Sequence, residues 1–141
     1  TGFEKLVLSD NDNSVTLGTN ASTTGIVTID GSNAGAGSNN TINASAMTHA
    51  VSIIGGDDTD TITGSAGDDT IHGGLGADNI TGGAGSDTFD YGNNTNAGTD
   101  VLVTFVAGAS NDVYAIDASL GSIVGDLTAG NTLSLATAAD V

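Results

Sequence analysis

The chain has 141 residues, a length that suits one modest domain, and its 17 acidic side chains against a single base, Lys5, give a formal net charge of −16. One base cannot neutralise a run of phosphates, so nucleic-acid binding is excluded, and no apolar run approaches the ~20 residues that a membrane-spanning helix needs. The absence of Cys excludes disulfides and thiolate metal sites, and residues 1–5 lack the basic-then-apolar pattern of a signal peptide.

Along the chain, short apolar clusters alternate with turn-forming Gly, Asn, Asp, Ser and Thr, and no segment shows sustained helical periodicity. This pattern predicts an all-β fold. The predicted strands cover residues 3–8, 14–17, 25–29, 41–43 and 50–54, then 99–106, 112–117 and 132–135, with a loop at 34–40. We divide the chain into degenerate solenoid-like strands that cap a roll (1–54), the repeats that form it (55–90) and a C-terminal β capping segment (91–141).

The repeats are four consecutive blocks of nine residues: GGDDTDTIT, GSAGDDTIH, GGLGADNIT and GGAGSDTFD. Every block begins with Gly, has Asp at its sixth position and has an apolar residue at its eighth. The sixth positions are Asp60, Asp69, Asp78 and Asp87, and the eighth are Ile62, Ile71, Ile80 and Phe89. Four copies in one phase indicate a repeat architecture rather than a solvated acidic loop.

Each block divides into a six-residue turn and a three-residue strand. Glycines suit the turn because its backbone must adopt positive φ and pass close to an ion. In the strand, alternation places the eighth position on the inner face and its neighbours on the outer face. If each block makes half a coil, eighteen residues complete one turn of a parallel β-roll, a form of β-solenoid, with stacked strands ~4.8 Å apart.

Stacked turns of this kind predict an oxygen-lined metal site. Asp60 would lie over Asp78 and Asp69 over Asp87, so that two carboxylates and several backbone carbonyls surround each ion. Ca²⁺ prefers such a shell of six to eight oxygens, whereas Mg²⁺ demands stricter octahedral geometry. Four turns give two ions, and residues 46–51 or 93–96 would complete further sites. The predicted metal-site residues are Asp58, Asp60, Asp69, Asp78, Asp87, Gly56, Gly64, Gly67, Gly74, Gly76, Gly83 and Gly85.

The four blocks resemble the RTX family of calcium-binding nonapeptide repeats (repeats-in-toxin, hemolysin-type), whose pattern is G-G-x-G-x-D-x-U-x. Asp58 departs from the glycine of the fourth position, and Ser65 departs from that of the second. The resemblance implies a bacterial protein that a type I system exports, unfolded in the low-calcium cytosol and folding outside the cell. Repulsion among the carboxylates agrees with this, because metal binding and folding should then be coupled.

The segment after the blocks is also similar to that family. Residues 89–92 resemble the aromatic close of an RTX roll. Residues 100–105, followed by Gly108, Asp112 and Asp117, resemble the segment that often caps it. Thr104 stands where the family often has Asp, so the resemblance implies a cap that does not itself bind metal.

Other motifs favour plainer interpretations. Residues 10–14 imitate the start of an EF-hand loop, but Val15 and Ala21 stand where that loop needs Gly and Glu, so a tight turn is predicted. His49 and His72 are expected at the surface and fit no zinc motif. The repeated Asp residues are explained by metal and no catalytic fingerprint occurs, so we do not expect an enzyme.

Our main hypothesis is a structural calcium-binding module of a secreted or cell-surface bacterial protein, resembling an S-layer protein, that folds and self-associates with calcium. One alternative is the secretion and folding module of an exported enzyme whose catalytic domain lies elsewhere. Another is an adhesin or ice-binding module, which would need a regular Thr or Asn rank. The third turn position, with Asp57, Ala66, Leu75 and Ala84, offers none.

Overall fold

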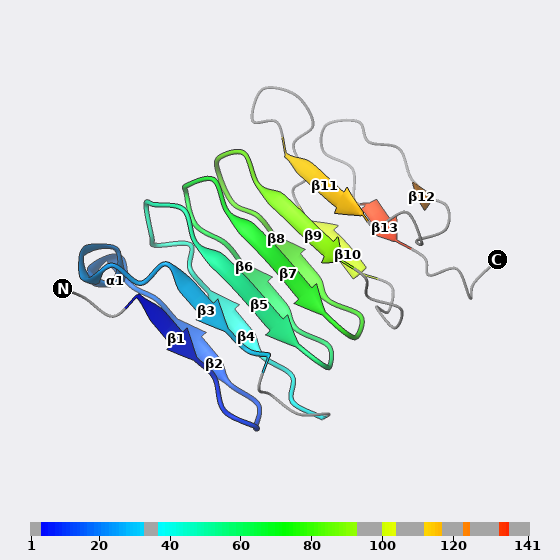
Figure 1. Ribbon diagram of the computed structural model, residues 1–141, viewed down its shortest axis with the longest axis horizontal. Helices are drawn as coiled ribbons and strands as arrows, with labels where there is room; N and C mark the ends of the chain where they lie inside the picture. The colour runs from blue at the N-terminus through cyan, green and yellow to red at the C-terminus, as the bar shows by residue number, and fades with distance from the viewer. Residues whose placement is uncertain are drawn as a thin grey trace.

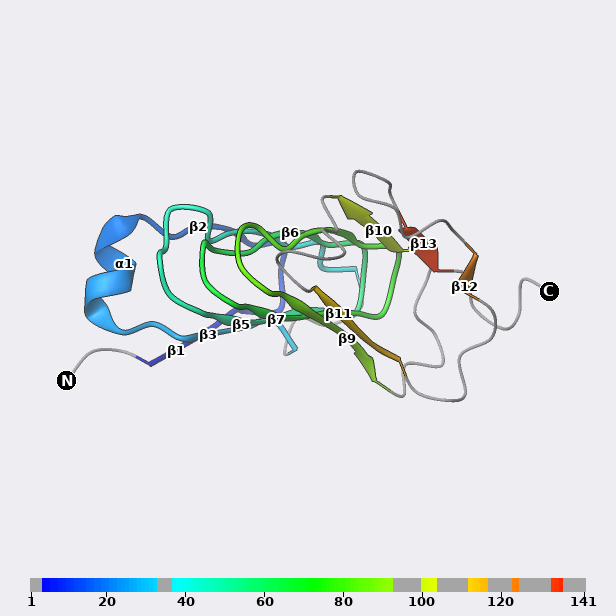
Figure 2. The ribbon, with the colours of Figure 1, turned by 90° about the horizontal axis from the view of Figure 1, so that it is seen from above.

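The computed structural model describes residues 4–32, 37–92, 100–103, 112–116, 123–124 and 133–135. From β1 to β11, its strands stack in chain order along the molecule (Figure 1). Seen from above, the coils enclose a narrow interior between two layers (Figure 2). The predicted all-β solenoid is therefore confirmed, with nearly all strand pairs parallel.

Successive strands alternate between the two sheets. The first sheet has the order β1-β3-β5-β7-β9-β11, and the second has the order β12-β13-β10-β8-β6-β4-β2. The first contains β1 (Lys5–Val7), β3 (Thr28–Asp30), β5 (Ser52–Gly56), β7 (Thr70–Gly74), β9 (Thr88–Gly92) and β11 (Val113–Ile116). The second contains β2 (Ser14–Thr16), β4 (Thr41–Asn43), β6 (Thr61–Thr63), β8 (Asn79–Thr81), β10 (Asp100–Val103), β12 (Ile123–Val124) and β13 (Leu133–Leu135). Each predicted strand range contains or overlaps one of these strands, and β12 was not predicted.

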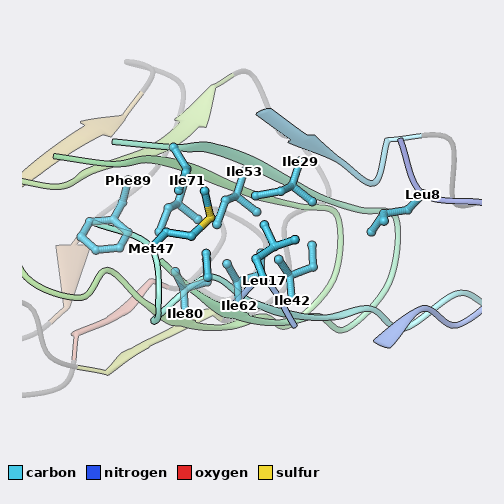
Figure 3. Packing of buried hydrophobic residues seen from close by; sticks show 12 residues of the cluster. Leu8, Leu17, Ile29, Ile42, Met47, Ile53, Ile62, Ile71, Ile80 and Phe89 are labelled. Atoms are coloured by element: carbon cyan, nitrogen blue, oxygen red, sulfur yellow. The ribbon is translucent and has the colours of Figure 1, made fainter. Parts of the chain in front are cut away.

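The core is two facing rows of apolar side chains, one from each sheet (Figure 3). The second residue of each strand from β3 to β9 points inward, and the register places these residues directly over one another, as with Ile53 and Ile71. Fully burying such a side chain contributes about 1.5–3 kcal/mol. The first row is Ile29, Ile53, Ile71 and Phe89, and the second is Leu17, Ile42, Ile62 and Ile80, all at most 8% exposed. The predicted inward direction of the eighth repeat position is confirmed.

A short helix, α1 (Thr19–Thr24), connects β2 to β3 at the N-terminal end (Figure 2). The expectation of no helix was wrong here, because six residues are too few to show a helical period. Gly25 ends the helix in the left-handed region at φ 83°. The helix's Ala21 packs against the core cluster. No helix in the described ranges is long and apolar enough to cross a membrane.

The C-terminal strands depart from the solenoid pattern. β13 pairs with β10 in antiparallel orientation, and β12 pairs antiparallel with β13. Of the residues that carried the resemblance to an RTX cap, Thr104, Gly108 and Asp117 lie outside the described residues. The predicted division of the chain at residues 54 and 90 stays a prediction, although strands on both sides of these limits share the same two sheets.

Candidate metal centre

The repeat aspartates lie at the ends of the turns, each directly before the strand that follows. Asp60, Asp69, Asp78 and Asp87 are all at most 1% exposed, although each carries an ionisable carboxylate. A buried charge is strongly unfavourable unless it is paired and hydrogen-bonded. The burial of these four side chains therefore calls for partners inside the solenoid.

Backbone N–H groups provide some of these partners along the edge where the chain enters the second sheet. Asp60 accepts the N–H of Asn40 at 2.7 Å, and its own N–H donates to Asp78 at 2.8 Å. The N–H of Asp78 in turn donates to Asp100 at 2.8 Å. We call this set, Asn40, Asp60, Asp78 and Asp100, the first column. Each carboxylate in it is tied through Oδ1 to the coil before it.

A second column runs along the edge that precedes the first sheet. Asp69 accepts the N–H of Val51 at 2.9 Å, and the N–H of Asp69 donates to Asp87 at 3.0 Å. The N–H of Asp87 donates to Asp112, also at 3.0 Å. We call Val51, Asp69, Asp87 and Asp112 the second column. The predicted stacking of Asp60 with Asp78 and of Asp69 with Asp87 is thus present in the fold.

Sequence reasoning did not assign Asp100 and Asp112 to the columns. They lie 22 and 25 residues after their partners, whereas the repeats keep a spacing of 18. The signal that could have found them is an Asp directly before an alternating apolar segment, as in Asp100-Val101-Leu102-Val103 and Asp112-Val113-Tyr114. Both continue a column into the C-terminal strands.

Two carboxylate oxygens in the first column have no partner. Oδ2 of Asp60 and Oδ2 of Asp78 are buried and accept no hydrogen bond. Leaving a buried polar group unsatisfied costs about 1–3 kcal/mol, and more when the group is charged. The two residues belong to adjacent coils. A cation between the coils would satisfy both oxygens.

The pKa values of the column aspartates also indicate that these carboxylates lack a compensating positive charge. Burial is the main cause that raises the pKa of Asp78 to about 7 and those of Asp60, Asp87 and Asp100 to about 6. Burial also raises the pKa of Asp69. Hydrogen bonds from backbone N–H groups oppose the shift without cancelling it. The single lysine does not help, because Lys5 pairs with Asp30 at 2.6 Å.

The first glycine of each block leaves room for oxygen atoms. A Cβ on Gly55 would overlap both the Asp60 carboxylate and the carbonyl oxygen of Gly73 one coil later. The Asp69 carboxylate and the Gly82 carbonyl meet Gly64 in the same way. Two acceptor oxygens thus converge where a side chain would lie. The carboxylate oxygen and the carbonyl oxygen repel each other unless a cation lies between them.

The other glycines divide by conformation. Gly56, Gly74, Gly76, Gly83 and Gly85 have φ between 112° and 149°, which confirms the predicted positive-φ turns. Gly67 does not share this conformation, so the prediction was wrong for the second turn. Gly67 is required for a different reason, since a Cβ there would overlap the backbone of His49 and Ala50. Asp58 accepts the N–H of Gly37 and does not join the first column.

The ligand atoms that the columns offer determine which kind of metal ion fits them. In the part of the chain that the structure describes, no three His, Cys, Asp or Glu side chains form a metal cluster. An ion would therefore take two carboxylates at most, with backbone carbonyls as its remaining protein ligands. That all-oxygen donor set fits Ca²⁺, and it does not fit metals that prefer imidazole or thiolate.

Both histidine rings contact backbone carbonyls. His72 Nδ1 is 2.5 Å from the carbonyl oxygen of Asp90, and His49 Nε2 is 2.9 Å from that of Ile26. A hollow of about 310 Å³ on the outer side of β5 and β7 is lined by Ser32, Ile54, Gly56, Asp57, His72, Gly74 and Leu75. None of the column carboxylates lines this hollow, and of the predicted metal-site residues only Gly56 and Gly74 do.

Comparison with known proteins agrees with this geometry. A family model, the RTX calcium-binding nonapeptide repeat, matches residues 54–89 as four copies. No curated protein and no solved structure matches the chain. The matched repeats contain four of the six column aspartates, Asp60, Asp69, Asp78 and Asp87. Residues 54–89 are therefore RTX calcium-binding nonapeptide repeats, and they make this part of the solenoid a structural calcium-binding RTX module.

Proposed function

We propose that Ca²⁺ binds between stacked turns of each column, shared by Asp60 with Asp78 and by Asp69 with Asp87. The observation that carries the proposal is the pair of buried, unpartnered oxygens, Oδ2 of Asp60 and Oδ2 of Asp78. Backbone carbonyls of the turns would complete each shell. Besides these four aspartates, the proposed metal-site residues are the turn glycines Gly56, Gly64, Gly67, Gly74, Gly76, Gly83 and Gly85. The expectation that Asp58 adds a ligand is not part of the proposal, because Asp58 accepts the N–H of Gly37.

The ion would act by charge compensation rather than by chemistry on a substrate. The RTX repeat is a structural motif and not a catalytic one. A divalent cation removes the repulsion among buried carboxylates and cross-links adjacent coils. Because the turns stack only in the folded chain, the free energy of calcium binding contributes to folding.

The proposed setting is a secreted or cell-surface bacterial protein with an S-layer-like role, exported by a type I system. RTX repeats are typical of secreted proteins. A net charge of −16 favours a compartment with abundant divalent cations, and extracellular calcium modules bind at roughly 10⁻⁴ to 10⁻³ M. In that setting, calcium would also bridge neighbouring copies of the chain.

Circular dichroism during a calcium titration tests the metal proposal. We expect the β-signal of the repeats to be lost in a chelator and to rise cooperatively with calcium, while magnesium at the same concentration leaves the repeats unfolded. A β-signal that does not depend on calcium would contradict the proposal. For the surface-layer role, calcium-dependent two-dimensional assembly of the full-length protein is the test. A protein that stays monomeric at saturating calcium would refute that role alone.

A second candidate function follows from the outer face of the second sheet. Its outward residues on β2, β4, β6 and β8 are Ser14, Thr16, Thr41, Asn43, Thr61, Thr63, Asn79 and Thr81. These eight side chains are uncharged in a strongly acidic chain and form two ranks whose members lie about 4.8 Å apart. The regular rank missing from the third turn position is thus present on a sheet face, which favours an adhesin or ice-binding role. Loss of ice-crystal shaping in Thr61→Lys, with Thr70→Lys on the opposite sheet as control, would support it; no shaping by the calcium-loaded wild type would refute it.

A further inference from the structure

The columns change in composition at their N-terminal ends. One coil before Asp60, the first column contains Asn40 in place of a carboxylate, and one coil before Asp69 the second contains Val51. The family match starts at residue 54, after both positions. The contacts at these two ends show how neighbouring coils can be joined by hydrogen bonds without an acidic side chain.

Asn40 is 1% exposed and has all of its polar side-chain atoms paired. Its Nδ2 donates to the carbonyl of Gly55 at 3.0 Å, and its Oδ1 accepts the side-chain amide of Asn13 at 2.8 Å. One coil later, Asp60 occupies the equivalent place, and its unpartnered Oδ2 lies beside the Gly73 carbonyl. Where Asn40 places a donor against a carbonyl, Asp60 places a second acceptor.

Ser65 performs the same task at the end of the second column. Its Oγ lies 2.7 Å from Oδ1 of Asp69 and 2.9 Å from the carbonyl oxygen of His49, and the side chain is buried. The Ser65 N–H also donates to Oδ2 of Asp69 at 2.5 Å. The second residue of the other three blocks is Gly, which has no hydroxyl. Oδ2 of Asp69 accepts the backbone N–H of Ser65, whereas Oδ2 of Asp60 and Oδ2 of Asp78 accept no hydrogen bond, and the added hydroxyl of Ser65 lies between Oδ1 of Asp69 and the His49 carbonyl.

We infer that Asn40 and Ser65 terminate the two calcium columns, each placing a neutral hydrogen-bond donor where the following coils need a cation. The inference rests on the proposed calcium function. It assigns ions to the gaps between Asp60 and Asp78 and between Asp69 and Asp87, and none to the gaps before them. The predicted extra site at residues 46–51 is then absent, because the Ser65 hydroxyl bonds there. The coils before the repeats hold together without calcium.

Hydrogen exchange of the wild-type chain tests this directly and needs no variant. In a chelator, the amides of Leu17 and Thr41, which donate to Asn43 and Asn13, should stay protected. The amides of Asn79 and Thr88, which donate to Asp60 and Asp69, should lose protection and regain it with calcium. Equal loss of protection in both groups on chelation would overturn the inference. Failure to bind any calcium would instead refute the proposed function.

An engineered column provides the second test. Asn40→Asp replaces the donor by an acceptor of the same shape, so it should bind one more calcium ion by calorimetry and make Thr41 protection calcium-dependent. Asn39→Asp adds the same charge at an exposed neighbour and should leave both unchanged. Ser65→Gly should make protection of Ala66, whose N–H donates to Met47, depend on calcium. The inference would be overturned if Asn40→Asp bound the same number of calcium ions as the wild type and its Thr41 amide lost protection to the same extent with and without calcium.

Discussion

The coils before the repeats and the coils of the repeats use the same aliphatic core but different chemistry at their edges. Ile42 and Ile62 are direct neighbours in register and are equally buried. The residues before their strands differ, since Asn40 is fully paired whereas Asp60 has an unpartnered buried oxygen. A solenoid coil can therefore be closed by amides or by carboxylates, and only the second solution requires an ion.

The largest effect should come from replacing the Asp60 carboxylate by an amide, as found at Asn40. Asp60→Asn should lose one calcium ion yet fold at lower calcium than wild type, because its amide can donate to the Gly73 carbonyl as Asn40 does to Gly55. Asp60→Ala should lose the same ion and be destabilised by about 1–3 kcal/mol, since the Asn40 N–H then has no acceptor. Calorimetry and calcium-dependent circular dichroism measure both variants.

An exposed aspartate serves as control for that exchange. Asp57→Asn removes an exposed charge three positions before Asp60 and leaves the buried carboxylates intact. It should keep the wild-type number of ions. If Asp60→Asn and Asp60→Ala had the same calcium requirement, the amide could not replace the ion, and the contrast between the two regions would lose its basis.

A smaller effect is expected from placing a side chain at Gly55, where two oxygen atoms converge. Gly55→Ala places a methyl group against the Asp60 carboxylate and the Gly73 carbonyl, so we expect a loss of about 1–3 kcal/mol in calcium-bound stability. Gly18→Ala, in a coil before the repeats, meets nothing within 4 Å and should be nearly neutral. Chemical denaturation at saturating calcium compares them. Equal stability of the two variants would contradict the close approach of these oxygens.

The two regions should also differ in the sign of their pH dependence. Without calcium, the folded repeats keep protons up to pH 6–7 on Asp60, Asp78, Asp87 and Asp100, which the unfolded chain releases near its pKa of 3.8. Because the folded state then binds more protons, calcium-free stability should fall as pH rises from about 4 to about 7. With calcium, acidification should weaken binding, since protons compete with the ion.

Asp30 provides the contrast in the coils before the repeats. Its contacts with Lys5 and Ser32 lower its pKa to about 2, so its contribution is present above about pH 4 and is lost as pH falls toward 2. Circular dichroism in chelator from about pH 7 down to about pH 4 shows whether protonation restores the repeat coils, and thermal unfolding of the Lys5→Met variant isolates the ion pair. Calcium-free stability that rises from about pH 5 to about pH 7 would contradict the buried, uncompensated carboxylates.

The repeats could be predicted from sequence because a fixed spacing determines which residues stack. Eighteen residues per coil place Asp60 over Asp78, and alternation turns Ile62 and Ile80 inward. Outside residues 55–90 this regularity ends: Asn40 precedes Asp60 by 20 residues, and Asp112 follows Asp87 by 25. Stacking there depends on the conformation of each connecting segment, which no sequence period encodes.

The roles of single polar residues were also outside the reach of pattern analysis. Ser65 is one departure from the repeat pattern, and only the fold shows that its hydroxyl lies between the His49 carbonyl and the Asp69 carboxylate. Likewise Asn40 is one of several Asn residues in a polar segment. Its place in the first column follows from the register of β4 with β6.

The most direct measurement is the position of the bound ion in a crystal grown at millimolar calcium, located by anomalous scattering. We predict a peak between Asp60 and Asp78, about 2.3–2.6 Å from a carboxylate oxygen of each, with none at the Asn40 amide or the Ser65 hydroxyl. Stacked turns that hold only water between those two carboxylates would contradict the account.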